Sequence, residues 1–379
     1  MTDPRIWRVV GDPLVRPTGS GDLTGQSVAV KDLYAVAGQR IGAGNPAWLD
    51  HAVPELAHAW AVERLLADGA AVHGIAQTDE LAYDLTGTNA HHGTPPNPLA
   101  PHRISGGSTS GPASAVSMGE ATIGLGTDTA GSIRVPAAYQ GLWGIRSTTG
   151  AVPMGGVLPL APSFDTVGWL THDPALLAEV GRSLLPPGGV PVGQVVVADD
   201  LLALADADVA AAVGELAAGR PRITWPMSVM AEMRAAMQTL EAFEAWRSHG
   251  AWLGNRLDTL GPDVRARFQR ASTVTAAQAD AARAQVERHR TGMRNHLGDR
   301  VLLLPSAPSV APAVNRPRTL DAVRQATVQL TCIAGIGGLP AVSIPVTTAD
   351  GLPAGACLIG PAGSDHALIE LAKSLTLHL

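Results

Sequence analysis

The sequence has 379 residues, of which 46% are hydrophobic and 16% charged, enough apolar material for a large folded core. A net charge of −6 without a basic run, together with only 4% aromatic residues, argues against nucleic acid or an anionic membrane as a partner. The N-terminal residues contain no long apolar segment, and nowhere do about 18 apolar residues follow one another. We therefore expect a cytoplasmic protein that does not span a membrane.

The first quarter of the chain predicts alternating strands and helices. Residues 1–25 are expected to be irregular, and a short strand over 26–30 ends at Lys31. A helix over 54–67 and a strand over 70–76 complete a strand–helix–strand unit, which favours a parallel sheet. A lysine at the end of a buried strand can lose its charge through desolvation and act as a base.

Two Gly/Ser-rich loops flank an apolar segment in the next part of the chain. The first, GGSTSG, spans residues 106–111, and the second, GTDTAGS, spans 126–132. Flexible linkers have a similar composition, but the segment between these loops needs burial, so their glycines should pack closely and their serines need partners. We expect a helix over 113–120 and another helix or turn beginning at Ser132.

Neither loop fits a phosphate-binding motif or a nucleophile elbow. A P-loop requires Lys and Ser/Thr after its second glycine, where this chain has Pro112 and Ala113. The patterns G-x-G-x-x-G and G-x-S-x-G are also absent from the two loops. The remaining interpretation is a serine nucleophile of another kind, with backbone N–H groups as oxyanion donors.

The rest of the chain is less informative. Residues 205–297 are rich in alanine and helical in pattern, most clearly over 273–294. Short buried strands are predicted over 195–197 and 301–304, followed by strand motifs over 338–345 and 351–355. The two cysteines, Cys332 and Cys357, have no metal-ligand spacing; we expect buried free thiols, although a disulfide between them stays open.

Four segments together resemble the amidase signature family: VAVKD, GGSTSG, GTDTAGSIRVPA and GLWGIRST. Members are serine hydrolases that cleave amides with a serine nucleophile, a second serine on a cis peptide bond, and a lysine. Their two serines are 24 residues apart, as are Ser108 and Ser132. The resemblance implies an α/β fold with a mixed central β-sheet covered by helices on both faces. It covers residues 24–170 and 298–372 of a single domain over 1–379, with a variable helical substrate-pocket region at about 171–297.

The resemblance also implies a role for each catalytic residue. Ser132 would be the nucleophile, Ser108 the proton relay, and Lys31 a base that must be neutral in the free enzyme. The cis peptide bond would join Gly107 to Ser108. The oxyanion hole would be formed by the backbone N–H groups of Thr129, Ala130, Gly131 and Ser132.

Some positions carry a supporting role or depart from the family pattern. Asp128 and Arg134 resemble a pair that braces the nucleophile loop, and the alternative is a surface ion pair of little consequence. Ala130 replaces the usual glycine, and its Cβ restricts the backbone there. Thr109 replaces a common serine and Pro112 a common glycine or serine; we expect both to be tolerated.

The implied substrate is a small-molecule amide, and neither a metal nor an organic cofactor is implied. Compact members of the family include plant indole-3-acetamide hydrolases, so the first reading is hydrolysis of a small aryl or alkyl carboxamide. Two alternatives stay open: hydrolysis of a urea derivative, carbamate or ester on the same Ser-Ser-Lys machinery, and a non-catalytic amidase-like scaffold. A glutaminase subunit for transamidation is disfavoured because those chains are longer. A homodimer is an expectation from the family only.

Overall fold

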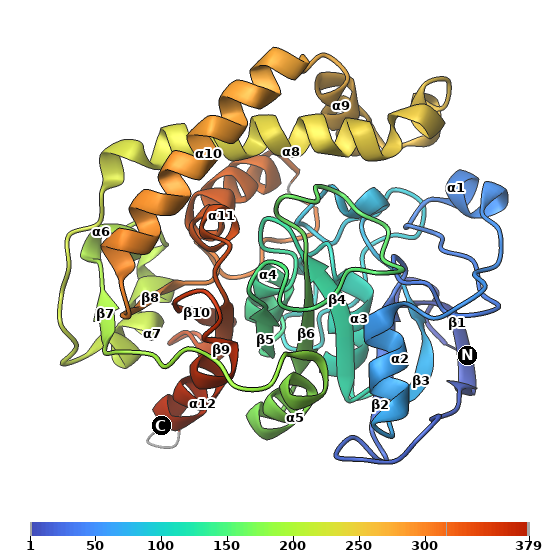
Figure 1. Ribbon diagram of the computed structural model, residues 1–379, viewed down its shortest axis with the longest axis horizontal. Helices are drawn as coiled ribbons and strands as arrows, with labels where there is room; N and C mark the ends of the chain where they lie inside the picture. Colours follow the sequence, from blue (N-terminus) through green and yellow to red (C-terminus); the bar gives the residue numbers. More distant parts are fainter. Residues whose placement is uncertain (1, 316, 377–379) are drawn as a thin grey trace.

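A ten-stranded mixed β-sheet forms the centre of the computed structural model, which describes residues 2–315 and 317–376 (Figure 1). The strands are β1 (Trp7–Val15), β2 (Ser27–Lys31), β3 (Ala71–Ala76), β4 (Ile123–Asp128), β5 (Trp143–Arg146), β6 (Thr166–Thr171), β7 (Val195–Val197), β8 (Val301–Pro305), β9 (Ala341–Thr347) and β10 (Pro353–Ile359). They are arranged in the order β1-β3-β2-β4-β6-β5-β9-β10-β8-β7.

The helices of this part of the chain are α1 (Pro46–His51), α2 (Trp60–Ala67), α3 (Ser110–Ser117), α4 (Arg134–Tyr139), α5 (Pro174–Leu184), α6 (Asp199–Leu202), α7 (Ala207–Ala217), α8 (Met230–Leu253), α9 (Pro262–Ala271), α10 (Ala276–Leu297), α11 (Pro317–Gly337) and α12 (Asp365–Thr376). Single turns of 3-10 helix are η1 (Glu80–Ala82), η2 (Met227–Val229) and η3 (Leu257–Thr259). None of the helices within 2–315 and 317–376 combines the length and apolar character that a membrane crossing requires.

The direction of the strands at the centre of the sheet brings two residues that are far apart in the sequence to the same edge. β2 pairs in parallel with both β3 and β4, so the predicted parallel strand–helix–strand unit is confirmed. Lys31 ends β2 and Asp128 ends β4. Because parallel strands finish at the same edge of a sheet, both residues lie at the edge where loops commonly carry function.

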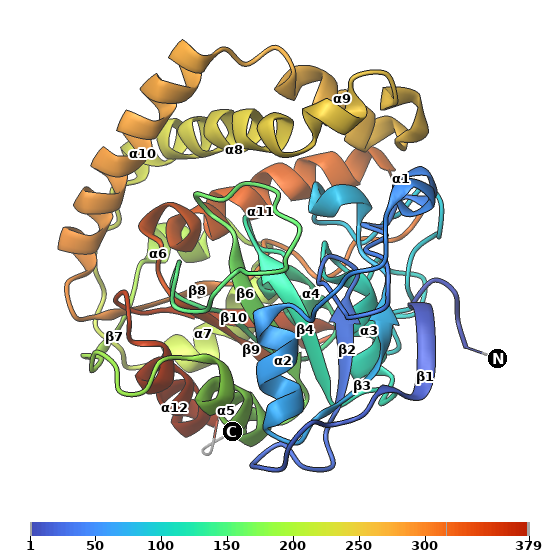
Figure 2. The same ribbon diagram turned by 45° about the vertical axis from the view of Figure 1, so that its right-hand side comes forward.

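Helices cover both faces of the sheet, as predicted (Figure 2). Gly168 and Trp169 are neighbours on β6, so they point to opposite faces. On one face α4 approaches so closely that a Cβ added to Gly168 would lie 2.7 Å from Ile133 Cγ1. On the other face Trp169 Nε1 donates a 3.0 Å hydrogen bond to the backbone oxygen of Leu177 in α5, against which α2 and α12 also pack.

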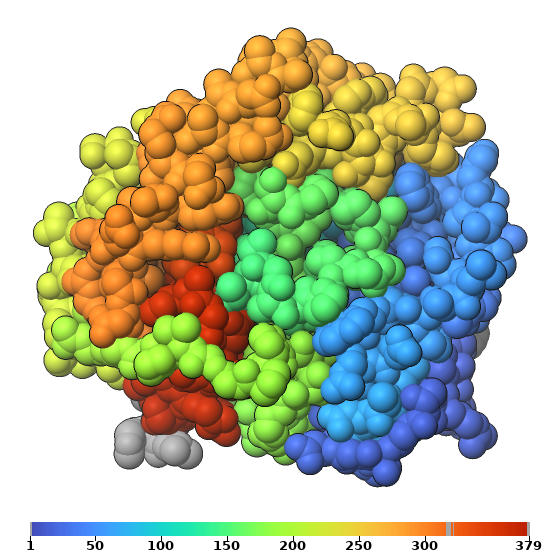
Figure 3. Space-filling view, in the orientation of Figure 1, coloured from blue at the N-terminus to red at the C-terminus, as the bar shows by residue number. Residues whose placement is uncertain are grey.

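A layer formed by α8, α9, α10 and α11 lies across the upper edge of the sheet in Figure 1, and its yellow and orange atoms cover that edge in Figure 3. The helices of this layer pack against one another. In α8 the buried Met230, Met233, Met237 and Leu240 recur at intervals of three or four residues, which places them on one face of the helix.

Several predicted boundaries differ from the structure. The lead-in over 1–25 contains β1, which pairs antiparallel with β3. The helix expected over 54–67 begins only at Trp60, because the preceding segment bonds elsewhere: the N–H of Ala59 donates to Ala35 O. The helix expected over 113–120 begins at Ser110 and places Pro112 in its first turn, where proline loses no intrahelical bond. Cys332 and Cys357 are buried free thiols, as expected.

Candidate active site

The edge of the sheet at which β2 and β4 end brings together the three residues singled out in the sequence. Lys31 is the last residue of β2, Ser108 precedes α3, and Ser132 precedes α4. The two loops are joined by a 3.3 Å hydrogen bond from the N–H of Thr109 to Ser132 O. Lys31 and Ser108 are fully buried, and Ser132 is 2% exposed.

A continuous chain of hydrogen bonds links the three side chains. Lys31 Nζ lies 2.8 Å from Ser108 Oγ, and Ser108 Oγ lies 2.9 Å from Ser132 Oγ. Each serine hydroxyl can donate one hydrogen bond while it accepts another, so the chain can be polarised in either direction. A proton that leaves Ser132 can therefore reach the lysine through Ser108.

Two threonine hydroxyls complete the surroundings of the lysine. Lys31 Nζ donates to Thr127 Oγ1 at 2.9 Å and to Thr109 Oγ1 at 3.1 Å. Thr109 Oγ1 donates its own hydrogen to Thr127 O at 3.2 Å, which leaves its lone pairs for the lysine. Nζ therefore has three hydrogen-bonding partners. An ammonium group can donate to all three, and a neutral amine can donate to the two threonines and offer its lone pair to Ser108.

Burial lowers the pKa of Lys31 to about 7. The loss of hydration disfavours the ammonium form, and this outweighs the attraction of three buried carboxylates, those of Asp79, Asp128 and Asp165. At neutral pH a large fraction of Lys31 is therefore available to accept a proton.

The bond between Gly107 and Ser108 is a cis peptide bond, as the family resemblance implied. Asp79 packs directly against it, because a Cβ added to Gly107 would lie 2.1 Å from Asp79 Oδ2. The same carboxylate accepts hydrogen bonds from Gly87 N at 3.0 Å and Ser110 Oγ at 3.1 Å. Gly107 is thus required sterically, and Asp79 connects the Ser108 loop to its neighbours.

A buried ion cluster holds the loop that carries Ser132. Asp128 accepts hydrogen bonds from Arg134 Nη2 at 2.8 Å and Nε at 3.1 Å, and from Arg146 Nη1 at 3.2 Å. Burial alone would raise the pKa of Asp128, but the two guanidinium groups outweigh it and hold that pKa well below its usual range. All three side chains are at most 1% exposed, so the pair is buried and is not the surface ion pair left open by the sequence.

The backbone N–H groups predicted to form the oxyanion hole differ in their surroundings. Gly131 N donates to Asp128 Oδ1 at 2.9 Å. Among the hydrogen bonds of the described residues, the N–H groups of Thr129, Ala130 and Ser132 have no acceptor. Three of the four predicted donors therefore remain open to a ligand beside Ser132.

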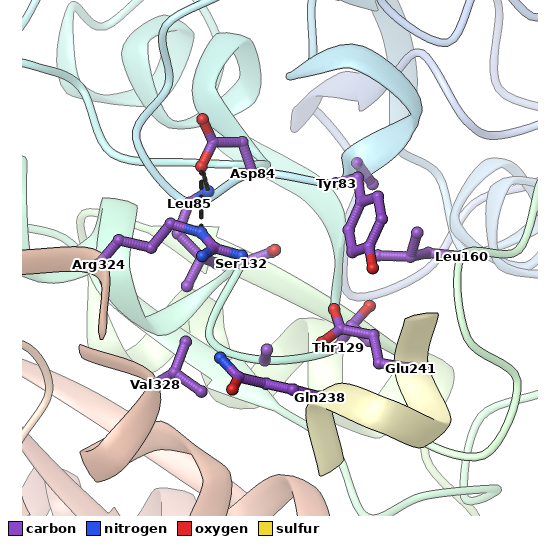
Figure 4. A pocket seen from close by; sticks show the side chains of 12 residues that line it. Tyr83, Asp84, Leu85, Thr129, Ser132, Leu160, Gln238, Glu241, Arg324 and Val328 are labelled. Atoms are coloured by element: carbon purple, nitrogen blue, oxygen red, sulfur yellow. Dashed lines mark hydrogen bonds and ion pairs between the residues drawn. The ribbon is translucent and has the colours of Figure 1, made fainter. Parts of the chain in front are cut away.

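A small cavity of about 20 Å³ opens beside Ser132 (Figure 4), enough for about one water molecule. Its wall combines Thr129 and Ala130 with Leu160 and with side chains from two helices of the upper layer. Five polar side chains that the sequence did not identify line it: Tyr83, Asp84, Gln238, Glu241 and Arg324. A wider cavity of about 510 Å³ adjoins it, and Asp84 and Arg324 line both.

Sequence reasoning assigned no role in the site to four residues that contact the reactive groups or their loop: Thr109 and Thr127 beside Lys31, and Arg146 and Asp165 beside the Ser132 loop. Arg146 lies in the segment GLWGIRST, so a family-like motif contained a signal for it, whereas Asp165 lies outside the four segments named above. A buried arginine in a strand and a buried aspartate in a turn each require a partner.

The arrangement is suited to covalent catalysis by a hydroxyl group. It offers a serine nucleophile, a relay to a weakly basic buried amine, and donors for a developing oxyanion. Within residues 2–315 and 317–376, no group of three or more His, Cys, Asp or Glu side chains is placed to hold a metal ion.

Known proteins resemble this chain over nearly its whole length. A family model described as Amidase matches residues 17–185 and 197–369. Amidase 1 of Arabidopsis thaliana is 33% identical over 412 residues, which cover 98% of this chain and 97% of the relative. A crystal structure described as an amidase has a TM-score of 0.86 and 28% identity, over 100% of this chain and 92% of that chain. Allophanate hydrolase of Kluyveromyces lactis has a TM-score of 0.85 and 25% identity, over 93% of this chain and 62% of that chain.

Proposed function

The chain belongs to the amidase signature family, and from this premise we propose that it hydrolyses the C–N bond of a small aryl or alkyl carboxamide. In this proposal Ser132 attacks the amide carbonyl and forms an acyl-enzyme. Ser108 and Lys31 carry the proton, and water then releases the acid. The observation that carries the proposal is the unbroken hydrogen-bonded chain from Lys31 through Ser108 to Ser132.

The first half of the reaction uses the relay twice, first toward Lys31 and then back toward the substrate. As Ser132 Oγ bonds to the carbonyl carbon, its proton passes to Ser108, and the proton of Ser108 passes to neutral Lys31. The N–H groups of Thr129, Ala130 and Ser132 stabilise the negative oxygen of the tetrahedral intermediate. The C–N bond then breaks, and the nitrogen takes a proton back through Ser108, so ammonia or an amine leaves.

The second half repeats these steps with water. Water loses a proton through Ser108 to Lys31 and attacks the acyl carbon of the ester on Ser132. The ester bond breaks, Ser132 recovers its proton through the relay, and the carboxylic acid is released. The lysine ends each half-reaction neutral, so every turnover begins from the same protonation state.

Ammonia release from primary amides tests this function. A panel of acetamide, benzamide, phenylacetamide and indole-3-acetamide is offered to the wild type, to Ser132→Ala, and to Ser272→Ala as a control at an exposed serine. We expect release by the wild type and the control, and none by Ser132→Ala. A fluorophosphonate probe should label Ser132 in the same two active proteins. A folded wild-type protein that neither reacts with the probe nor releases ammonia would indicate a scaffold.

Hydrolysis of a urea derivative, carbamate or ester is the second candidate. The likeness to allophanate hydrolase and the polar wall of the small cavity favour it, because ureas and carbamates carry more hydrogen-bonding groups than an alkyl amide. A parallel panel of a substituted urea, a carbamate and an ester separates the two functions. Labelling of Ser132 together with turnover only in this second panel would replace the first proposal.

A further inference from the structure

The cavity beside Ser132 contains an arginine whose hydrogen-bonding groups are largely unused. Arg324 is 13% exposed, its Nε has no hydrogen-bond partner among the described residues, and its guanidinium group points into the cavity (Figure 4). The nearest carboxylate oxygen, Asp84 Oδ1, lies 3.6 Å from that Nε. This is beyond hydrogen-bond length, so a guanidinium with five donors remains available to a ligand.

Asp84 is already engaged by other groups. Its carboxylate lies 3.0 Å from Arg267 Nη1 and accepts hydrogen bonds from Leu85 N at 2.7 Å and Thr86 Oγ1 at 2.8 Å. One carboxylate thus faces two arginines. A buried cation that shares its nearest carboxylate with a second arginine is stabilised by a further anion, because its desolvation is otherwise poorly compensated.

Glu241 is the remaining charged group of the cavity wall, and it sets the total charge of the cluster. It is 8% exposed, and its carboxylate has no hydrogen-bond partner among the described residues. Burial raises the pKa of Glu241 to about 7; Arg324 and Arg267 oppose this rise, and Asp165 and Glu244 add to it. With Glu241 ionised, the cluster of Asp84, Arg267, Arg324 and Glu241 is neutral; with Glu241 protonated it is positive. In neither state does it attract a cation.

The position of Arg324 also constrains how a ligand would lie. Its side chain lines both the small cavity beside Ser132 and the wider cavity of about 510 Å³. The other charged residues that line the wider cavity are Asp84, Asp263, Arg267 and Arg270. An anionic group held by Arg324 therefore sits at the boundary between the two cavities. Because Ser132 lines the same small cavity as Arg324, the remainder of a short molecule held there would be directed toward Ser132.

We propose that the substrate is a carboxamide of a short dicarboxylic acid, whose free carboxylate is bound by Arg324 while its amide group lies at Ser132. This inference specifies the substrate of the proposed amide hydrolysis and rests on that proposed function. A planar carboxylate matches the guanidinium fork, which can form two parallel hydrogen bonds to it. A purely aryl or alkyl substrate would instead place hydrocarbon against the unused hydrogen-bond donors of the guanidinium, which is unfavourable.

A matched pair of substrates tests the inference. Succinamic acid and butanamide have the same chain length, and only the first carries a carboxylate. We expect wild-type kcat/KM to favour succinamic acid by about 10- to 100-fold, the effect of a charge-assisted hydrogen bond. In Arg324→Gln this preference should fall to near one. Arg182→Gln removes an exposed arginine, 53% exposed and paired with Asp22, and should keep the preference.

A second measurement on the wild type does not depend on the folding of the variant. Succinate should slow fluorophosphonate labelling of Ser132 about 10- to 100-fold more effectively than butyrate does. Equal protection by the two acids would overturn the role of Arg324, as would equal wild-type kcat/KM for the two amides. If kcat/KM for succinamic acid and kcat/KM for butanamide fall by the same factor in Arg324→Gln, Arg324 has a structural role only.

Failure of this inference and failure of the proposed function would give different experimental results. If Ser132 is labelled and butanamide is hydrolysed as well as succinamic acid, amide hydrolysis stands and the anionic substrate is refuted. If Ser132 is not labelled and neither amide releases ammonia, the proposed function fails, and the inference that rests on it fails too.

Discussion

Thr129 Oγ1 donates a 2.6 Å hydrogen bond to Asp165 Oδ1, and this contact connects the Ser132 loop to the wall of the cavity. The other oxygen of Asp165 accepts hydrogen bonds from Leu160 N and Ala161 N, both at 2.9 Å. Thr129 and Leu160 both line the cavity. A single buried carboxylate therefore sets the spacing between the loop that carries the nucleophile and the opposite wall.

Asp165→Asn should lower both stability and activity. An amide group cannot accept on both sides as a carboxylate does, so its NH₂ would face the hydroxyl of Thr129 or the N–H groups of Leu160 and Ala161. We expect the free energy of unfolding in urea to fall by about 1–3 kcal/mol, and kcat/KM to fall as well. Asp350→Asn, at an exposed turn, is the control. Equal stability of the two variants would show that these contacts contribute little.

Lys31 can be titrated directly, because the chain has only two lysines, Lys31 and Lys373. Carbon-13 labelling of the lysine side chains gives two NMR signals, and Lys373→Met assigns them. The Lys31 signal should titrate at about pH 7. Protonated Lys31 cannot accept the proton of Ser108, so kcat/KM should decline as the pH falls through about 7. A midpoint near ~10.4 would instead report an ordinary lysine.

Removing the amine of Lys31 should abolish most of the activity while the nucleophile remains. In Lys31→Met, kcat should fall by about 10²- to 10⁴-fold, the usual contribution of a general base. Lys373→Met changes only a partly exposed i,i+3 pair with Glu370 and should retain wild-type kcat. Comparable kcat values in the two variants would remove Lys31 from the mechanism.

Asp128→Asn should destabilise the protein strongly. The change leaves Arg134 and Arg146 buried without a full counter-charge, and breaking a buried pair in this way costs about 3–5 kcal/mol. Asp22→Asn breaks the exposed pair with Arg182 and should change the free energy of unfolding by at most about 1 kcal/mol. Urea unfolding of both variants checks the difference. A similar small effect in both would mean that the buried cluster does not stabilise the fold.

Two neighbouring positions of the nucleophile loop should differ in how strongly they respond to an exchange of Gly and Ala. Ala130 is not among the residues with positive φ, so its Cβ imposes no strain, and Ala130→Gly should cost only about 0.4–1 kcal/mol. Gly131 has φ of +126°, and an added Cβ would lie 3.0 Å from Thr331 Cγ2. Gly131→Ala should therefore lower kcat far more than Ala130→Gly, as steady-state kinetics would show. The reverse order would contradict the observed backbone.

The family resemblance singled out Lys31, Ser108 and Ser132 from short motifs, and the structure brings their side chains into one hydrogen-bonded chain. The lysine's further partners were not predictable in the same way. Thr127 contacts Lys31 only because β2 and β4 run in parallel and end at one edge, and no local pattern encodes that register. Thr109 was noted only as a replacement for serine, although its hydroxyl also contacts the lysine.

The wall of the cavity was beyond the reach of sequence motifs for a different reason. Tyr83, Glu241 and Arg324 come from segments far apart in the chain, and they meet only when α8 and α11 pack over the sheet edge. Alanine-rich helical periodicity predicted helices in the middle of the chain but not which residues face the cavity. For this reason the sequence predicted an aryl or alkyl substrate, whereas the wall of the cavity carries charged side chains.

The helix that presents Arg324 also anchors the nucleophile loop. Thr331 lies seven residues, or about two turns, further along α11 and therefore on the same side of it. Its Oγ1 donates a 2.6 Å hydrogen bond to Ala130 O, and its backbone oxygen accepts one of 3.0 Å from Arg134 Nη1. Any substitution that tilts or slides α11 to admit a larger molecule would also displace the groups around Ser132. Laboratory evolution of new selectivity should therefore succeed more readily with library positions in α8, such as Gln238 and Glu241, than with changes that move α11.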